Sequence, residues 1–187
     1  MKHTKSLALA AMFIAIGLVL PFLTGQIPEI GRMLLPMHIP VLLCGLICGR
    51  KYGLVVGFIL PIMRGIIFGI PVLFPMGASM AFELATYGFV IGFIYHTSRW
   101  QCMLSLFRAL IIAMLAGRVA WGIAMMVIIG VGGTGTFTWQ LFIAGAFINA
   151  IPGILLQLVL IPTIMIALNK TGLVPFRSKH PKKASHE

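Results

Sequence analysis

The stretch that decides the class of fold is Ser6-Leu-Ala-Leu-Ala-Ala-Met-Phe-Ile-Ala-Ile-Gly-Leu-Val-Leu-Pro-Phe-Leu23, because it is apolar from end to end. No charged residue occurs between Ser6 and Pro28. A helix needs roughly 20 apolar residues to cross the hydrocarbon core of a bilayer. The preceding Lys2 and Lys5 would also suit a signal peptide, but no convincing small-x-small cleavage site follows them. We therefore expect a retained first membrane helix.

The composition of the whole chain leads to the same class of protein. Hydrophobic residues make up 60% of the 187 residues and charged residues 9%, whereas soluble domains average about 45–50% and 25%. The mean hydropathy is +1.07. So few polar residues cannot cover the surface of a small globule in water. Composition thus excludes a soluble enzyme, a disordered chain and a disulfide-stapled secreted domain, and it predicts a multi-pass protein of the cell membrane.

Six apolar stretches approach the length of a membrane span. They cover residues 6–23, 37–48, 52–70, 78–95, 106–129 and 139–168. The second is too short to cross a core of about 30 Å at about 1.5 Å per residue, so we expect residues 33–36 to extend it or neighbouring helices to surround it. Strand periodicity is absent from the sequence. The predicted fold is an all-α bundle of six transmembrane helices in residues 1–170, followed by a basic cytoplasmic tail in residues 171–187.

The distribution of charge indicates the orientation in the membrane. Fourteen Lys and Arg residues against three Glu residues give a net charge of +11. In a soluble protein this excess would suggest a nucleic-acid partner, but here the cations gather in alternate connections. The other connections, residues 24–36, 71–77 and 130–138, contain Arg32 as their one cation. The positive-inside rule then places both termini in the cytoplasm, as an even number of spans also requires. We expect the lipid bilayer, and no nucleic acid, to be the partner of the basic tail.

The residues needed for catalysis or for a cofactor are missing from the sequence. There is no Ser/His/Asp constellation, no HExxH motif and no pair of carboxylates within the spans. The segment Gly130-Val-Gly-Gly-Thr-Gly135 lacks the Gly-Lys-Ser/Thr ending of a phosphate-binding loop and follows a predicted helix. We interpret it as a flexible outer lid. Cys44, Cys48 and Cys102 have no zinc or redox spacing. We therefore expect no enzymatic activity, no metal, no cofactor and no nucleotide site.

Polar side chains inside the spans are the candidates for function, because a charge in hydrocarbon costs at least ~2.5–3.5 kcal/mol. They are His38, Arg64, Glu83, Arg118, Asn149 and Gln157. Glu83 can neutralise one of the two arginines, which leaves one guanidinium over. In a structural interpretation, both arginines share Glu83 or bond to backbone carbonyls freed by Pro61 and Pro152. In a functional interpretation, the surplus arginine binds a carboxylate or phosphate of a ligand. His38 and Asn149 add neutral hydrogen-bonding groups, although His38 also suits a plain helix start.

We place the ligand in the outer half of the molecule. The loops at residues 24–36, 71–77 and 130–138 are apolar, glycine-rich and nearly uncharged, so they can close over a small molecule and exclude water. Spans four to six would form the floor of this pocket.

The substrate-binding candidates combine the polar groups with two aromatic residues. They are Arg64, Glu83, Arg118, Asn149, His38, Phe74 and Trp139. If the ligand is a carboxylate, Arg118 or Arg64 would hold it, and Asn149 would bind an amide or a hydroxyl group. Trp139 or Phe74 would cover the apolar part.

Small residues recur on one face of the first span. Ala8, Ala11 and Ala15 lie at helical spacing, and Ala11-Met-Phe-Ile-Ala15 is a small-xxx-small motif. Such a face lets another helix approach closely. That helix belongs either to this chain or to a partner protein.

Two consecutive segments carry a resemblance to a known family. They are Leu34-Leu-Pro-Met-His-Ile-Pro-Val-Leu-Leu-Cys-Gly45 and Gly49-Arg-Lys-Tyr-Gly53. They are similar to an x-Ile-Pro-hydrophobic entry to span two and to a Gly-x-x-x-Gly turn into span three. Together with six short spans and cytoplasmic ends, the chain resembles, over nearly its whole length, the substrate-binding S component of an energy-coupling factor (ECF) vitamin transporter.

This resemblance implies a division of labour between subunits. The S component would capture a vitamin outside the cell, and two cytoplasmic ATPase subunits would act on it through a transmembrane coupling subunit. The alanine motif Ala8, Ala11 and Ala15 would dock against that coupling subunit. Delivery would then use ATP hydrolysed by partner chains, in keeping with the absence of a nucleotide site in this sequence.

The identity of the vitamin rests on one segment. Met37-His-Ile-Pro40 is most similar to pantothenate-type members, and an intramembrane arginine suits the carboxylate of pantothenate. Riboflavin-type members commonly carry an acidic Asp-x-x-Ile-Pro version, from which Met37 and His38 depart. Riboflavin, folate, cobalamin and pyrimidine precursors stay as alternative substrates. From a different class, a stand-alone channel or secondary transporter, or a membrane-embedded enzyme acting on a lipid head group, stays as an alternative function.

Overall fold

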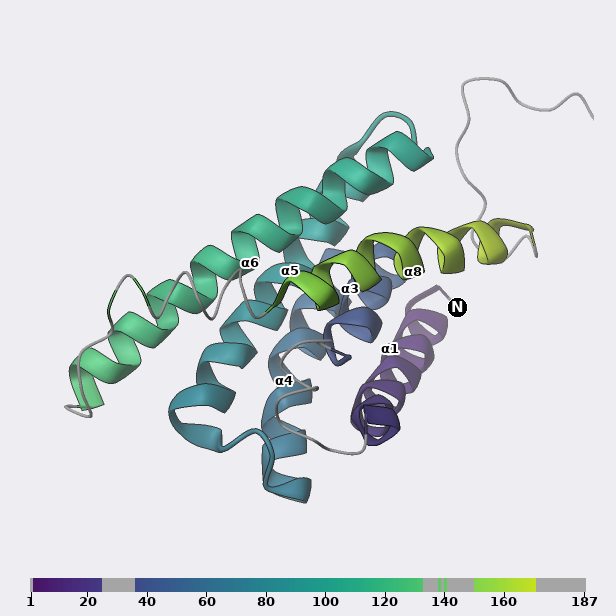
Figure 1. Cartoon of the computed structure of the whole chain (residues 1–187). Coiled ribbons are helices and arrows are strands. Elements are labelled where there is room, and N and C mark those ends of the chain that lie inside the picture. Colours follow the sequence, from purple (N-terminus) through teal and green to yellow (C-terminus); the bar gives the residue numbers. More distant parts are fainter. Residues whose placement is uncertain (1, 25–35, 133–137, 139, 141–149, 171–187) are drawn as a thin grey trace, which may run out of the picture.

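The computed structural model describes residues 2–24, 36–132, 138, 140 and 150–170, and all regular structure in them is helical (Figure 1). The elements are α1 (Lys2–Val19), η1 (Leu20–Thr24), α3 (His38–Cys48), α4 (Arg50–Phe68), η2 (Leu73–Gly77), α5 (Ala78–Thr97), α6 (Met103–Gly132) and α8 (Ile151–Lys170). Five helices in the described residues are long and apolar enough to cross a membrane, and α3 is a shorter apolar helix. The all-α membrane fold predicted from the sequence is confirmed.

The predicted spans agree with these helices apart from their ends. The fifth span is longer than predicted, because α6 runs from Met103 to Gly132. The sixth span was predicted from residue 139, but residues 139 and 141–149 lie outside the described part of the chain, and α8 begins at Ile151. The predicted basic tail, residues 171–187, also lies outside it.

The short helix α3 is surrounded by protein. It has 11 residues, and every residue from His38 to Leu46 is buried. It contacts α1, α4, α5 and α8. A helix with this environment does not need the length to cross lipid alone, since its neighbours cover it. The expectation that the second span is accommodated by its neighbours is confirmed for the described residues.

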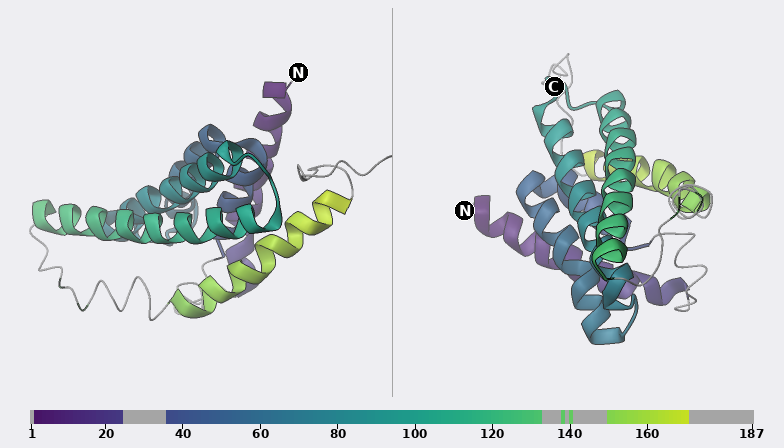
Figure 2. Two further views of the ribbon diagram at one scale, coloured as in Figure 1. Left: turned by 90° about the horizontal axis from the view of Figure 1, so that it is seen from above. Right: turned by 90° about the vertical axis from the view of Figure 1, so that its left-hand side faces the viewer.

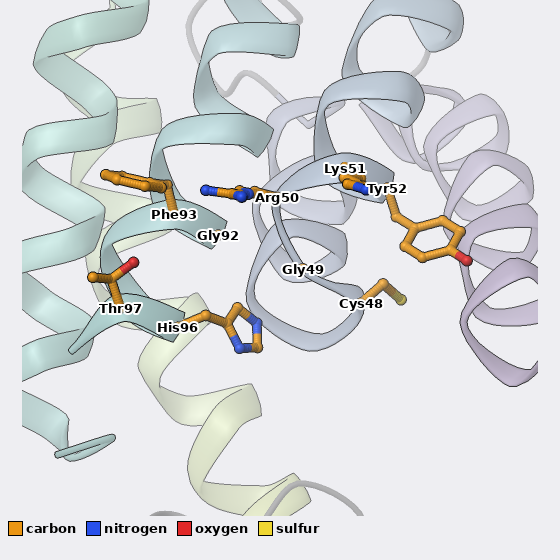
Figure 3. Close-up of a pocket in the computed structure, with 9 residues that line it drawn as sticks. All are labelled: Cys48, Gly49, Arg50, Lys51, Tyr52, Gly92, Phe93, His96 and Thr97. Carbon is orange, nitrogen blue, oxygen red and sulfur yellow. The ribbon is translucent and has the colours of Figure 1, made fainter. Parts of the chain in front are cut away.

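The basic connections lie together at one end of the bundle. The start of α1, the α5–α6 loop and the end of α8 point to the same end in Figure 1 and in the left view of Figure 2. The α3–α4 turn is there too, because Gly92 near the end of α5 packs on the backbone of Arg50. Figure 3 shows this turn beside the last residues of α5. The positive-inside rule assigns this end to the cytoplasm, so the opposite end is the outer end.

Glycines let the backbones of α3, α4 and α5 approach one another closely. A Cβ atom added at Gly45 on α3 would lie 2.5 Å from the carbonyl oxygen of Gly88 on α5. One added at Gly92 would lie 2.7 Å from the backbone nitrogen of Arg50 on α4. Gly53 on α4 also packs directly on the backbone of Gly88. We call Gly45, Gly53, Gly88 and Gly92 the glycine seam, and it follows the rule that small residues allow close helix packing in membranes.

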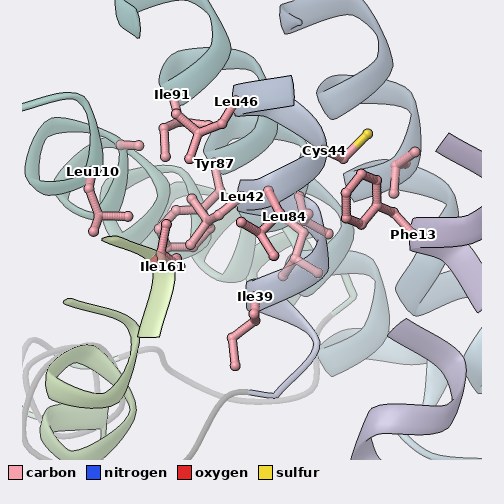
Figure 4. Packing of buried hydrophobic residues seen from close by; sticks show 14 of the residues in the cluster. Phe13, Ile39, Leu42, Cys44, Leu46, Leu84, Tyr87, Ile91, Leu110 and Ile161 are labelled. Carbon is pink, nitrogen blue, oxygen red and sulfur yellow. The ribbon is translucent and has the colours of Figure 1, made fainter. Parts of the chain in front are cut away.

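Apolar side chains from α1, α3, α4, α5, α6 and α8 fill the centre of the bundle (Figure 4). The residues labelled there include Phe13 of α1, Leu42 of α3, Ile91 of α5, Leu110 of α6 and Ile161 of α8. All five are buried. The core therefore joins the first helix of the chain to the last, and it fixes how the polar side chains among these helices meet.

Candidate functional site

Three of the predicted site residues form a buried charged cluster. Arg118 Nη1 on α6 lies 2.8 Å from Glu83 Oε1 on α5, and His38 Nε2 on α3 lies 3.6 Å from the same oxygen. Their exposed fractions are 4%, 2% and 1%. Helix packing thus brings together groups that are 35 to 80 positions apart in the sequence. We call His38, Glu83 and Arg118 the charged cluster.

Tyr87 completes the surroundings of this cluster. It follows Glu83 by one helical turn, and its ring packs edge-on against the ring of His38 with centroids 5.1 Å apart. Gly117 makes room for it, because a Cβ at that position would lie 2.9 Å from the Tyr87 ring. Tyr87 was not among the site residues expected from the sequence. Its signal was the spacing of four residues from Glu83, which places both on one helical face.

The charged cluster lies toward the outer end. His38 is the first residue of α3, and Glu83 is in the second turn of α5, whose first residue is at the outer end. Gln157, in the second turn of α8, is 1% exposed. Arg118 is at the middle of α6. Polar side chains of α3, α5, α6 and α8 therefore occupy the outer half of the bundle.

Several buried side-chain nitrogens in this region have no hydrogen-bond partner among the described residues. They are Nε and Nη2 of Arg118, Nδ1 and Nε2 of His38 and Nε2 of Gln157. A buried donor without a partner costs about 1–3 kcal/mol, and more if it is charged. Since Glu83 contacts only Nη1 of Arg118, the guanidinium keeps two nitrogens with which it can bind an anion.

Arg64 has a different environment. Its Nη1 donates a hydrogen bond of 2.9 Å to the carbonyl oxygen of Leu18, and its guanidinium lies 5.6 Å from the ring of Phe22 and 5.5 Å from that of Phe68. The last carbonyls of a helix lack regular partners. Here α1 ends at Val19 and continues as η1, a 3₁₀ helix, which is tighter than an α-helix. It includes Pro21, a residue without an N–H. Arg64 therefore supplies a donor to the end of α1.

This environment bears on the two interpretations that the sequence left open for the arginines. Arg64 is not a surplus guanidinium without a protein partner, because it bonds to backbone, as the structural interpretation allowed. The carbonyl it uses belongs to Leu18 and not to the helices interrupted by Pro61 or Pro152. Arg64 and Arg118 do not share Glu83, since the described residues that lie against the Glu83 carboxylate are Arg118 and His38.

The remaining candidates are Phe74, Trp139 and Asn149. Phe74 lies in η2 at the outer end, where its side chain is 55% exposed. Trp139 and Asn149 lie outside the described residues. Of the predicted aromatic and amide groups, only Phe74 can therefore be located.

The predicted docking alanines share one face of α1. Ala8, Ala11 and Ala15 are all exposed, whereas Ala10 and Phe13 face the core. No described helix of this chain covers the alanine face. The possibility of an internal seam at these alanines is thus not realised in the described residues.

The comparisons with known proteins identify the family. The model for the substrate-specific component of ECF transporters matches residues 5–165. The chain belongs to this family. No curated protein and no solved structure matches it. The S component is therefore a multi-pass protein of the cell membrane and a transporter subunit, and the family generally implies a vitamin substrate and an ECF module as partner.

The S component contains no group of three or more His, Cys, Asp or Glu residues that could hold a metal ion in its described part. Cys44, Cys48 and Cys102 are free thiols. The chemistry that the described site offers is non-covalent: ion pairing, hydrogen bonding and the exclusion of water.

Proposed function

We propose that this S component captures a water-soluble vitamin that carries a carboxylate, with pantothenate as the first candidate. It would bind the vitamin at the outer side and deliver it with ATP hydrolysed by two cytoplasmic ATPase subunits, through a transmembrane coupling subunit. The observation that carries this proposal is Arg118, a buried guanidinium with one nitrogen on Glu83 and two nitrogens without a partner in the described residues.

Each residue has a role in this proposal. Arg118 binds the vitamin carboxylate through Nε and Nη2, and Glu83 holds the guanidinium in place through Nη1. His38 and Asn149 bind hydroxyl or amide groups of the vitamin. Trp139 or Phe74 covers its apolar part, as the sequence suggests.

We assign Arg64 an indirect role in binding. Its hydrogen bond to Leu18 fixes the end of α1, which precedes in the sequence the loop of residues 24–36 that we expect to close over the ligand. Arg118 is the better candidate for direct contact because Arg64 is already engaged by a carbonyl and two phenyl rings.

The exposed alanines support the partner that the family implies. We propose that Ala8, Ala11 and Ala15 dock against a helix of the coupling subunit, because methyl side chains allow two helices to approach closely. No described helix of this chain occupies that face.

Calorimetry with two ligands tests the carboxylate site. Pantothenate and pantothenol, the corresponding alcohol, differ only in the charged group. The wild-type protein should bind pantothenate at least tenfold more tightly, since a buried hydrogen bond to a charged group contributes about 1.5–3 kcal/mol. The double variant Glu83→Gln/Arg118→Gln removes both charges together, so neither is left buried and unpaired. It should bind the two ligands with equal affinity.

Arg64→Gln serves as the comparison, because it removes the other intramembrane guanidinium. It should keep the preference for pantothenate. If the Glu83→Gln/Arg118→Gln protein folds and keeps the wild-type preference, the carboxylate site at Arg118 is wrong. If only Arg64→Gln loses the preference, Arg64 holds the carboxylate instead.

Native mass spectrometry of the purified wild-type protein identifies the vitamin independently. A retained mass equal to pantothenate supports the proposal. A retained riboflavin, folate, cobalamin or pyrimidine precursor would replace pantothenate as the substrate.

A further inference from the structure

A cavity of about 430 Å³ lies at the cytoplasmic end, far along the bundle from the charged cluster. It is formed between the α3–α4 turn and the last two turns of α5 (Figure 3). Its lining consists of Cys48, Gly49, Arg50, Lys51, Tyr52, Gly92, Phe93, His96 and Thr97. Nothing in the proposed transport function uses this cavity.

The cavity is basic and lacks a carboxylate partner. Arg50 and Lys51 are exposed, and His96 adds an imidazole at the mouth. The guanidinium of Arg50 lies 5.4 Å from the centroid of the Phe93 ring, which holds it over the cavity side of α5. Among the described residues Glu83 is the one acidic side chain, and it is buried against Arg118 toward the outer end. The two cations therefore have no carboxylate to pair with in the described structure.

Exposed apolar side chains continue from the cavity toward the membrane centre. On α4, Leu54 follows Arg50 by one turn and is 41% exposed. On α5, Phe93 and Phe89 precede Thr97 by one and two turns, and their rings stack with centroids 6.0 Å apart. Both rings are exposed. Cations at the end of the bundle thus lie directly above an apolar surface on the same two helices.

We propose that this cavity binds the phosphate headgroup of an anionic phospholipid from the inner leaflet. Arg50 and Lys51 bind the phosphate oxygens, Arg50 with the geometry that suits bidentate binding. One acyl chain lies along Leu54, Phe93 and Phe89. A free phosphate monoester has the same phosphate chemistry as the lipid headgroup, but it has no acyl chain to contact the apolar surface. This difference distinguishes a lipid from a soluble phosphate as the ligand.

The test uses the full-length protein in nanodiscs of phosphatidylcholine with increasing phosphatidylglycerol, and native mass spectrometry counts the retained lipids. The variant Arg50→Gln/Lys51→Gln removes two charges from the cavity. The matched control Arg99→Gln/Lys170→Gln removes two charges from the same end of the bundle but outside the cavity. Each cation near an anionic surface contributes about a fivefold factor in affinity, so the cavity variant should retain phosphatidylglycerol about 25-fold less well.

A steric variant keeps the test independent of charge. Thr97→Trp fills the cavity at an exposed position at the end of α5 and leaves every cation in place. It should lower phosphatidylglycerol retention, while the Arg99→Gln/Lys170→Gln control stays within a few-fold of wild type. These two results together support a site in the cavity.

Four other results would overturn the proposal. Equal losses in the cavity variant and the control would mean a general surface-charge effect. Absence of retained phosphatidylglycerol on the wild-type protein would mean that no lipid site exists. Competition by millimolar glycerol phosphate would assign the cavity to a soluble phosphate. Unchanged lipid retention with lost assembly of the ECF module would assign Arg50 and Lys51 to a protein partner.

Discussion

The glycine seam makes a sharp prediction for Gly45→Ala. The added methyl group would lie 2.5 Å from the carbonyl oxygen of Gly88 and 2.7 Å from Cγ2 of Ile91. Ordinary van der Waals contact begins at 3.4 Å, so α3 and α5 would have to separate by about 0.9 Å. The carbonyl belongs to a helix backbone, and Ile91 is fully buried. Neither neighbour can simply rotate away.

The magnitude follows from two opposing terms. Overpacking of a filled core costs about 1–3 kcal/mol, and a clash with backbone belongs at the upper end of this range. Alanine in a helix interior is about 0.8–1.0 kcal/mol better than glycine, which offsets part of the cost. The free energy of unfolding should therefore fall by about 2 kcal/mol. For a chain of this length that corresponds to a decrease in Tm of about 4–8 °C.

The assay is thermal unfolding of the purified protein in detergent, followed by circular dichroism. Gly130→Ala on α6 is the matched control, because a Cβ there would meet no atom within 4 Å from another part of the described chain. Its Tm should be unchanged or slightly raised. A Gly45→Ala protein that unfolds at the wild-type temperature would refute the close packing of α3 on α5.

Three further predictions concern coupling and the end of α1. Ala15→Trp should reduce vitamin transport by the assembled ECF transporter at least tenfold and leave binding to the solubilised S component unchanged; equal loss of both would indicate internal packing. The wild-type S component alone in liposomes should bind the vitamin without accumulating it, and concentrative uptake would contradict the dependence on partner ATPases. Arg64→Gln removes the hydrogen bond to Leu18 and should lower the Tm by about 4–8 °C; an unchanged Tm would show that this bond does not stabilise α1.

The positions of the helices and the class of protein could be predicted from the sequence, because both depend on local composition. A run of apolar residues with the length of a bilayer crossing predicts a span whatever packs beside it. The short helix α3 was also foreseen, because its length excluded an isolated crossing. The alternating cations predicted the grouping of the α1, α3–α4, α5–α6 and α8 ends that the structure shows.

The pairing of the buried polar side chains could not be predicted from the sequence. The sequence offers Glu83 two possible partners of identical chemistry, Arg64 and Arg118. Only the packing of α5 on α6 decides that Arg118 is the partner. The partner of Arg64 is a backbone carbonyl, and backbone partners leave no complementary side chain to find. Pro21 was the available signal, because a proline at the end of α1 marks carbonyls without regular donors.

The energetics of the charged cluster favour a role in binding over a role in stability. Replacing a buried ion pair with apolar side chains of similar volume is often neutral or stabilising by about 1–4 kcal/mol. The ion pair between Glu83 and Arg118 is therefore weak evidence for a role in stability. Arg118 also keeps two nitrogens without a partner in the described residues, which adds to the cost of burying it. An anionic ligand would supply the missing acceptors, so the same arrangement that weakens the empty bundle would strengthen the binding of a carboxylate.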